Sequence, residues 1–132
     1  MATLLLVDDH PDLSDVIGEL LLMNGHKVQK CVSGEEAVEK LQSVQPDAIV
    51  TDQRLPGMSG VDLCRRVRSD PALADIPVIV CSADDSCSHE VERAGADEFW
   101  LKGSERLFDG IARLDTLLQQ FKAMRGISSD GQ

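Results

Sequence analysis

The amino-acid sequence predicts a single α/β domain, a doubly wound five-stranded parallel sheet in the order 2-1-3-4-5 with helices on both faces. Five short apolar segments alternate with five helical patterns, which is typical of parallel βαβ units. The chain has 132 residues, 42% of them hydrophobic, which is enough for one domain with its own core. The second segment is half polar, unlike the first, third and fourth, so we expect it at a sheet edge. Right-handed crossovers then favour the order 2-1-3-4-5, with a topological switch point between the first and third strands.

Each predicted element has a local signal. The predicted strands cover residues 3–7, 27–31, 48–51, 78–81 and 99–101. The first helix begins near Pro11 and stops at Gly25, a residue that commonly ends helices. Ser33 and Glu36 predict a capping box that opens the second helix, and Pro46 ends that helix.

The second half of the chain continues this alternation. Ser59 is expected to cap a third helix that ends before Pro71. A short fourth helix follows Asp85. The last helix is long and ends near Arg125. Its apolar residues recur at helical spacing: they are Leu107, Ile111, Leu114, Leu118 and Phe121. We expect residues 1–126 to form the domain and residues 127–132 to form a polar tail.

The composition excludes several classes of protein. A formal net charge of −10 argues against a surface that binds nucleic acid or an anionic membrane. The four cysteines lack C-x-x-C spacing and the density of a secreted disulfide scaffold, so we expect reduced thiols. The apolar run at residues 4–7 is too short for a signal or membrane segment. We therefore expect a cytoplasmic protein with no direct contact to nucleic acid or membrane.

Polar groups stand at the carboxyl ends of four predicted strands. Asp8 and Asp9 follow the first strand, Asp52 the third, Ser82 the fourth and Lys102 the fifth. Three carboxylates at one rim repel each other, so the cluster needs a cation, and oxygen ligands suit Mg²⁺ or a similar hard ion such as Mn²⁺. A dication, an ammonium and a hydroxyl around one carboxylate make a site for a phosphoryl group, with Asp52 as the nucleophile.

Other sites have less support. The three histidines, His10, His26 and His89, show no metal-ligand spacing, so we expect them to be solvated or structural. A flavodoxin would need hydroxyls and amides in its first loop, where this chain has acids that repel a phosphate. A dehalogenase-type phosphatase would need a second acid two residues after Asp52, and Arg54 stands there. No nucleotide-binding glycine motif is present.

The sequence resembles the response-regulator receiver domains of two-component signalling. The resemblance covers about residues 3–124 and rests on motifs that occur in the right order at the strand ends. These are residues 7–9, Asp52 together with residues 55–60, residues 80–83, and residues 95–102. It implies the 2-1-3-4-5 sheet and a regulatory phosphoacceptor domain rather than an enzyme.

The resemblance also implies roles for the acidic residues. Asp52 would accept a phosphoryl group from a phosphohistidine on a sensor histidine kinase or a histidine phosphotransfer protein. Asp9, Asp52 and the backbone carbonyl of Arg54 would bind Mg²⁺, with Asp8 acting directly or through water. Arg54 and Asp84 are expected at the mouth of the site, where their pairing would hinder water and slow self-dephosphorylation.

The remaining implied roles concern switching. Ser82 would move toward the phosphoryl oxygens, Lys102 would contact one of them, and Phe99 would turn inward. The switch residue is Phe rather than the common Tyr, so its inward state has no hydroxyl hydrogen bond. Gly103 replaces the usual proline and its cis bond, so we expect a trans bond or a more mobile loop, which bears on the aim of Lys102.

The resemblance places contacts with other proteins on two surfaces. The fourth helix, fifth strand and fifth helix would meet a downstream protein, and the first helix would meet the kinase. Homodimerisation is left open. The alternative function is a pseudo-receiver, a protein-interaction module that keeps the fold without phosphotransfer.

Overall fold

The structure is a computed structural model that describes residues 2–124, apart from the side chains of residues 11–14. The predicted helix end near Arg125 and the tail at residues 127–132 lie outside the described residues. Five parallel strands form one sheet in the order β2-β1-β3-β4-β5, as predicted. The strands are β1 Thr3–Val7, β2 Lys27–Cys31, β3 Ala48–Asp52, β4 Val78–Ser82 and β5 Glu98–Leu101.

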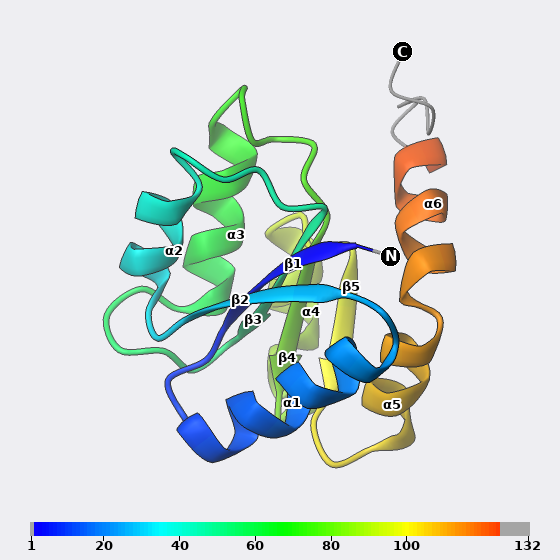
Figure 1. The fold of residues 1–132 in the computed structure, drawn as a ribbon. Coiled ribbons are helices and arrows are strands. Elements are labelled where there is room, and N and C mark those ends of the chain that lie inside the picture. Colours follow the sequence, from blue (N-terminus) through cyan, green and yellow to red (C-terminus); the bar gives the residue numbers. More distant parts are fainter. Residues whose placement is uncertain (1, 125–132) are drawn as a thin grey trace.

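Helices cover both faces of this sheet, which confirms the doubly wound architecture. Figure 1 shows α1 and α5 on one side of the sheet and α2 and α3 on the other. The helices are α1 Pro11–Met23, α2 Gly34–Lys40, α3 Gly60–Ser69, α4 Ser88–Arg93, α5 Glu105–Ala112 and α6 Leu114–Met124, with a 3₁₀ helix η1 at Asp85–Cys87. No helix within residues 2–124 has the length and apolar character needed to cross a membrane.

Strand side chains alternate between two cores, one on each face. In β1, Leu4 and Leu6 belong to the core that α1, α5 and α6 cover, whereas Leu5 and Val7 belong to the core that α2, α3 and α4 cover. Because both faces of the central strands are buried, their sequences are apolar almost throughout. In β2 most positions are exposed, and its place at the sheet edge is confirmed.

The start of α2 differs in detail from the predicted capping box. The Ser33 hydroxyl accepts the N–H of Glu36 at 3.1 Å, as expected, but the Glu36 carboxylate accepts the N–H of Val32 at 3.1 Å instead of closing onto Ser33. The helix also ends at Lys40, earlier than the predicted end at Pro46. Residues 41–43 continue only as turns.

The complete capping box lies at the start of α3. The Ser59 hydroxyl accepts the N–H of Asp62 at 3.1 Å, and the Asp62 carboxylate accepts the N–H of Ser59 at 3.2 Å. Both groups satisfy backbone donors that a helix start leaves without partners. This box fixes where α3 begins, directly after the loop that follows Asp52.

The C-terminal helical segment is two helices rather than the one long helix predicted. α5 ends at Ala112 and α6 begins at Leu114, with Arg113 between them. The apolar stripe is nevertheless continuous, and all five predicted positions are buried: Leu107, Ile111, Leu114, Leu118 and Phe121. Because both helices share one apolar period, the pattern contained no sign of the break.

Candidate functional site

The strand register brings the carboxyl ends of the strands to one rim. The first residue after β1, Asp8, donates its N–H to the Cys31 carbonyl at 3.0 Å, and the N–H of Lys102 donates to the Ser82 carbonyl at 2.8 Å. Parallel pairing therefore continues one residue beyond these strand ends. The backbones of Asp8 and Lys102 are thus held by the sheet, which is more rigid than a free loop.

Lys102 and Asp52 form the central ion pair of the rim. The Nζ of Lys102 lies 2.9 Å from the Oδ2 of Asp52 and 3.8 Å from the Oδ2 of Asp8. Asp52 is only 5% exposed and Asp8 only 3%. A buried carboxylate needs a positive partner to offset its desolvation, and this single ammonium faces two of them.

The bond after Lys102 is trans, which is one of the two outcomes expected from Gly103, a trans bond or a more mobile loop. The described residues contain no cis peptide bond, and Gly103 adopts a left-handed φ of +75°. The hydroxyl of Ser104 donates to the Leu101 carbonyl at 2.6 Å, which closes the turn. The aim of Lys102 therefore comes from its pairing with Ser82 and from this turn, without the proline usual in the family pattern.

Asp8, Asp9 and Asp52 form the acidic cluster that the sequence predicted. One oxygen from each lies within 4.8 Å of the others, together with a ring nitrogen of His10. Burial raises the pKa of the Asp8 carboxyl, while its hydrogen bond from the His10 backbone and the charge of Lys102 act in the opposite direction. Clustered carboxylate oxygens are the donors that a hard divalent cation prefers, so the donor set fits Mg²⁺.

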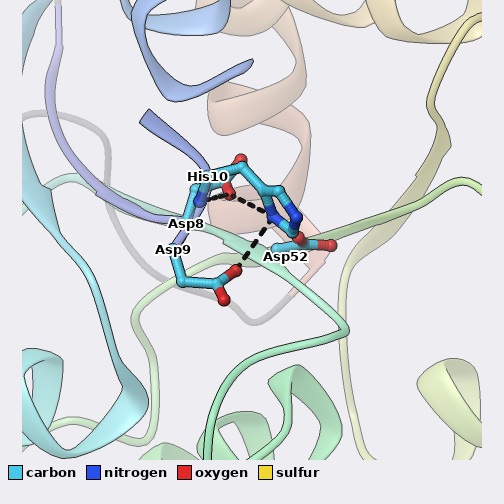
Figure 2. Close-up of side chains that lie close together, drawn as sticks. All are labelled: Asp8, Asp9, His10 and Asp52. Atoms are coloured by element: carbon cyan, nitrogen blue, oxygen red, sulfur yellow. Dashed lines mark hydrogen bonds and ion pairs between the residues drawn. The ribbon is translucent and has the colours of Figure 1, made fainter. Parts of the chain in front are cut away.

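His10 belongs to this cluster, which its spacing in the sequence did not indicate. Figure 2 shows its imidazole turned toward the carboxylates. Its Nδ1 lies 3.1 Å from the Oδ1 of Asp9 and 3.7 Å from the Oδ1 of Asp8. The available signal was adjacency, because His10 directly follows the acidic pair, although the three histidines show no repeated ligand spacing.

Gln53 and Gly60 hold the loop after Asp52, a role that their sequence pattern did not indicate. The side-chain oxygen of Gln53 accepts the N–H of Val61 at 2.9 Å, and its backbone carbonyl accepts the N–H of Gly60 at 3.0 Å. A Cβ at Gly60 would lie 2.6 Å from the Asp52 carbonyl oxygen, so only glycine allows this approach. The start of α3 is thereby packed directly against the backbone of Asp52.

Ser82 and Asp84 lie on the loop after β4. The Ser82 hydroxyl accepts the N–H of Asp84 at 3.1 Å, and the Asp84 carboxylate accepts the N–H of Ser86 at 2.9 Å. The hydrogen bonds with Ser86 are the main cause of the lowered pKa of Asp84, and the charge of Arg54 is a minor one. In this structure, Asp84 thus serves first as the cap of η1, with Arg54 nearby.

Phe99 is buried in the core beneath α4. The residue is 8% exposed. The guanidinium carbon of Arg106 lies 5.8 Å from the ring centroid, and the Nη2 of Arg106 donates to the Phe99 carbonyl at 3.2 Å. Both residues also line a surface cavity of about 510 Å³ beside α4 and β5. Arg106 therefore covers Phe99 on its solvent side.

Comparison with known sequences identifies the family of the chain. The family model of the response regulator receiver domain matches residues 4–112. The gliding motility regulatory protein of Myxococcus xanthus is 42% identical over 83% of this chain and 15% of its own length. The DNA-binding dual master transcriptional regulator RpaA of Synechocystis is 33% identical over 91% of this chain and 50% of its own length. The chain thus spans half or less of these two curated relatives.

Solved structures agree with this assignment. The receiver domain of sensor histidine kinase PA1611 from Pseudomonas aeruginosa superimposes with a TM-score of 0.77 at 27% identity, over 92% of this chain and 98% of that one. That structure holds a magnesium ion coordinated in its active-site cleft. The sheet order, the acidic rim and the family match lead to one conclusion: the chain belongs to the response regulator receiver domains of two-component signalling.

Proposed function

We propose that this chain is a phosphorylation-dependent signalling switch in which Asp52 accepts a phosphoryl group from a phosphohistidine of a sensor histidine kinase or a histidine phosphotransfer protein. The contact that carries the proposal is the 2.9 Å pair between the Oδ2 of Asp52 and the Nζ of Lys102. It places a cation beside the one carboxylate that ends the central strand β3. Phosphoryl transfer depends mainly on positioning and on neutralising oxygen charge, which is what this pair offers.

In the proposed reaction, one bond forms and one breaks. A carboxylate oxygen of Asp52 attacks the phosphorus, an acyl phosphate forms, and the P–N bond of the phosphohistidine breaks. The bonding electrons return to the imidazole nitrogen of the donor. Lys102 then exchanges its contact with the Asp52 carboxylate for a phosphoryl oxygen, so its charge remains paired throughout.

The proposed metal ligands are Asp9, Asp52 and the backbone carbonyl of Arg54, with Asp8 acting directly or through water. When bound, Mg²⁺ or Mn²⁺ would neutralise phosphoryl oxygens beside the carboxylate. The chain's own part is to keep these oxygens close, which the β1–β3 register and the Gly60 contact both support.

The proposed switch connects Ser82 with Phe99. The Ser82 hydroxyl would leave the N–H of Asp84 and donate to a phosphoryl oxygen, and the Phe99 ring would fill the space it vacates. Because Phe99 is already mostly buried, the expected ring movement is a repacking within the core beneath α4. Arg106, which lies over the ring and holds the Phe99 carbonyl, would have to follow.

We further propose that Arg54 and Asp84 lengthen the lifetime of the phosphoryl group by hindering water at the mouth of the site. Both side chains are exposed, and the charge of Arg54 acts on Asp84. The decay rate of phosphorylated Arg54→Ala, followed by intact mass, tests this role. A decay rate equal to that of the unaltered chain would contradict it.

The proposed protein contacts follow from the same layout. A downstream protein would bind α4, β5 and α5, the elements around Phe99, and α1 would meet the phosphodonor. We propose residues 1–126 as the receiver domain, residues 127–132 as a tail, and the cytoplasm as its location. Because RpaA, of which the chain spans half the length, is a DNA-binding regulator, an effector domain elsewhere in the same protein is also a candidate output.

Incubation with acetyl phosphate and Mg²⁺, followed by intact mass spectrometry, tests phosphoryl acceptance. We expect the mass of one phosphoryl group on the unaltered chain and none on Asp52→Asn. Asp47→Asn is a matched control, because Asp47 stands just before β3 at the opposite end of the same strand. A folded, unaltered chain that takes no phosphoryl group would contradict the proposal and favour the pseudo-receiver.

A further inference from the structure

His10 occupies an unusual position for a helix-capping residue. It is the N-cap of α1, yet its side chain makes no capping hydrogen bond. Its backbone N–H donates to the Oδ1 of Asp8 at 2.9 Å, and its imidazole is turned toward the acidic cluster. The side chain is therefore not engaged at the helix start. Its contacts are instead with Asp9 and Asp8.

The carboxylates of the cluster face two nitrogen-bearing side chains. Lys102 lies against the Oδ2 atoms of Asp52 and Asp8, whereas the Nδ1 of His10 lies near the Oδ1 atoms of Asp8 and Asp9. The two oxygens of Asp8 thus face different sides of the site. On the side away from Lys102, oxygen donors and one imidazole nitrogen converge.

The spacing of these donors fits a single coordination sphere. One atom each from Asp8, Asp9, His10 and Asp52 lies within 4.8 Å of the other three. At metal–ligand distances of about 2.0–2.2 Å, opposite ligands of an octahedral ion lie roughly 4–4.4 Å apart. The four donors therefore need only small movements to share one ion. The side chain of His10 is 67% exposed, so little packing opposes such a movement.

We infer that His10 supplies a nitrogen ligand to the divalent cation of this site, which raises the affinity of the site for ions that accept imidazole relative to its affinity for Mg²⁺. The inference rests on the proposed metal site and extends its ligand set. Mg²⁺ prefers oxygen, whereas later first-row ions such as Co²⁺ bind imidazole well and bind more tightly in general. The selectivity attributable to His10 is the ratio of Co²⁺ to Mg²⁺ affinity, compared with and without the imidazole.

Metal binding by the full chain tests the inference without relying on phosphorylation. Calorimetric titration with Co²⁺ and with Mg²⁺ would compare the unaltered chain with His10→Ala, which loses no side-chain cap. We expect Co²⁺ affinity to fall about tenfold or more, the scale on which ligand partners affect metal sites, and Mg²⁺ affinity to change less than about twofold. His89→Ala, an exposed histidine on α4, is the matched control and should leave both affinities unchanged.

Pulsed electron paramagnetic resonance of the Mn²⁺-loaded chain gives a direct second readout. We expect a ¹⁴N coupling from a bound imidazole in the unaltered chain and in His89→Ala, and its loss in His10→Ala. An unaltered chain that binds Mn²⁺ without this coupling would overturn the inference. A His10→Ala variant that binds Co²⁺ and Mg²⁺ more tightly by the same factor would also overturn it, because His10 would then only compete with the cation for Asp9.

Failure of this inference is distinguishable from failure of the proposed function. An unaltered chain that takes a phosphoryl group from acetyl phosphate, but shows no ¹⁴N coupling, keeps the proposed function and loses the His10 ligand. A chain that shows the coupling but takes no phosphoryl group keeps the ligand and loses the proposed function. Circular dichroism of each variant confirms that the fold is retained in every comparison.

Discussion

Lys102 contacts Asp52 at 2.9 Å even though Gly103 follows it at a left-handed φ of +75°. The N–H of Lys102 pairs with the Ser82 carbonyl, and the turn after it is closed by Ser104. The aim of the ammonium thus comes from the sheet edge and the turn.

Replacing Lys102 by Met should slow phosphorylation of Asp52 by roughly 100-fold, since a positioned donor to developing oxygen charge contributes on that scale. The rate of adduct formation from acetyl phosphate at fixed Mg²⁺, measured by intact mass, is the readout. Lys122→Met, on α6, is the control for losing one positive charge. A Lys102→Met variant as fast as this control would contradict the assigned role.

Gly103→Ala and Gly103→Pro should differ in the free energy of unfolding and in the rate of phosphorylation. A Cβ at Gly103 meets nothing within 4 Å, so Ala is penalised mainly by the left-handed φ, and unfolding free energy should fall by about 1 kcal/mol. Pro fixes φ near −65° and cannot adopt this turn, so it should lower stability further and also slow phosphorylation. Urea denaturation and acetyl phosphate kinetics measure the two effects. Equal stability for both variants would show that the turn tolerates a negative φ.

Gly110→Ala should destabilise the fold by about 2 kcal/mol, in the range expected for overpacking a core. A Cβ at this position would overlap the indole ring of Trp100, a fully buried side chain on β5. Urea denaturation followed by circular dichroism measures the change. Gly18→Ala on α1 is the control, because its Cβ would meet mainly the flexible end of Lys30 and Ala favours helix. It should be neutral or stabilising.

His26 should make the fold less stable in mild acid. Its Nδ1 accepts the N–H of Ala2 at 3.1 Å, and burial lowers its pKa below the ordinary value of 6.5, although Asp115 at 4.0 Å acts in the opposite direction. The unfolded chain therefore binds the proton more readily than the folded one. The contribution of His26 is fully present above pH 6.5 and is lost as the pH falls toward the folded-state pKa.

The denaturant concentration at the unfolding midpoint, measured at about pH 7 and at about pH 5, tests this dependence. Histidine changes its charge within this pH range. His26→Gln should flatten the decline, while His89→Gln, exposed on α4, should leave it as it is in the unaltered chain. A decline that is equally steep without His26 would assign the acid sensitivity to other groups.

Much of the fold could be predicted because the signals were local. The five strands, the edge position of β2 and the cap at Ser59 each depend on residues that are neighbours in the chain. The break at Arg113 could not be predicted, since the apolar period of α5 continues into α6. The early end of α2 at Lys40 was also missed, because Pro46 marks only a limit beyond which a helix cannot run.

In the candidate site, too, some residues could be predicted from the sequence and others could not. The carboxylates of Asp8, Asp9 and Asp52 were recognisable because each follows a buried strand. The roles of Gln53 and Gly60 were not, because they depend on how closely α3 approaches the backbone of Asp52. A polar residue in a loop has no pattern that reveals which backbone group it will meet.

The sequence by itself determined the sheet, its order and the set of groups that reach its carboxyl rim. The alternation of buried and exposed residues, and the polar residues at strand ends, are properties of short segments. Such segments can be recognised directly in a sequence. Only the tertiary structure decided how those groups pair. It joined Lys102 to Asp52 without a proline, directed Asp84 to the cap of η1, and turned His10 into the acidic cluster. Such contacts depend on distances between separate loops, which local patterns do not encode.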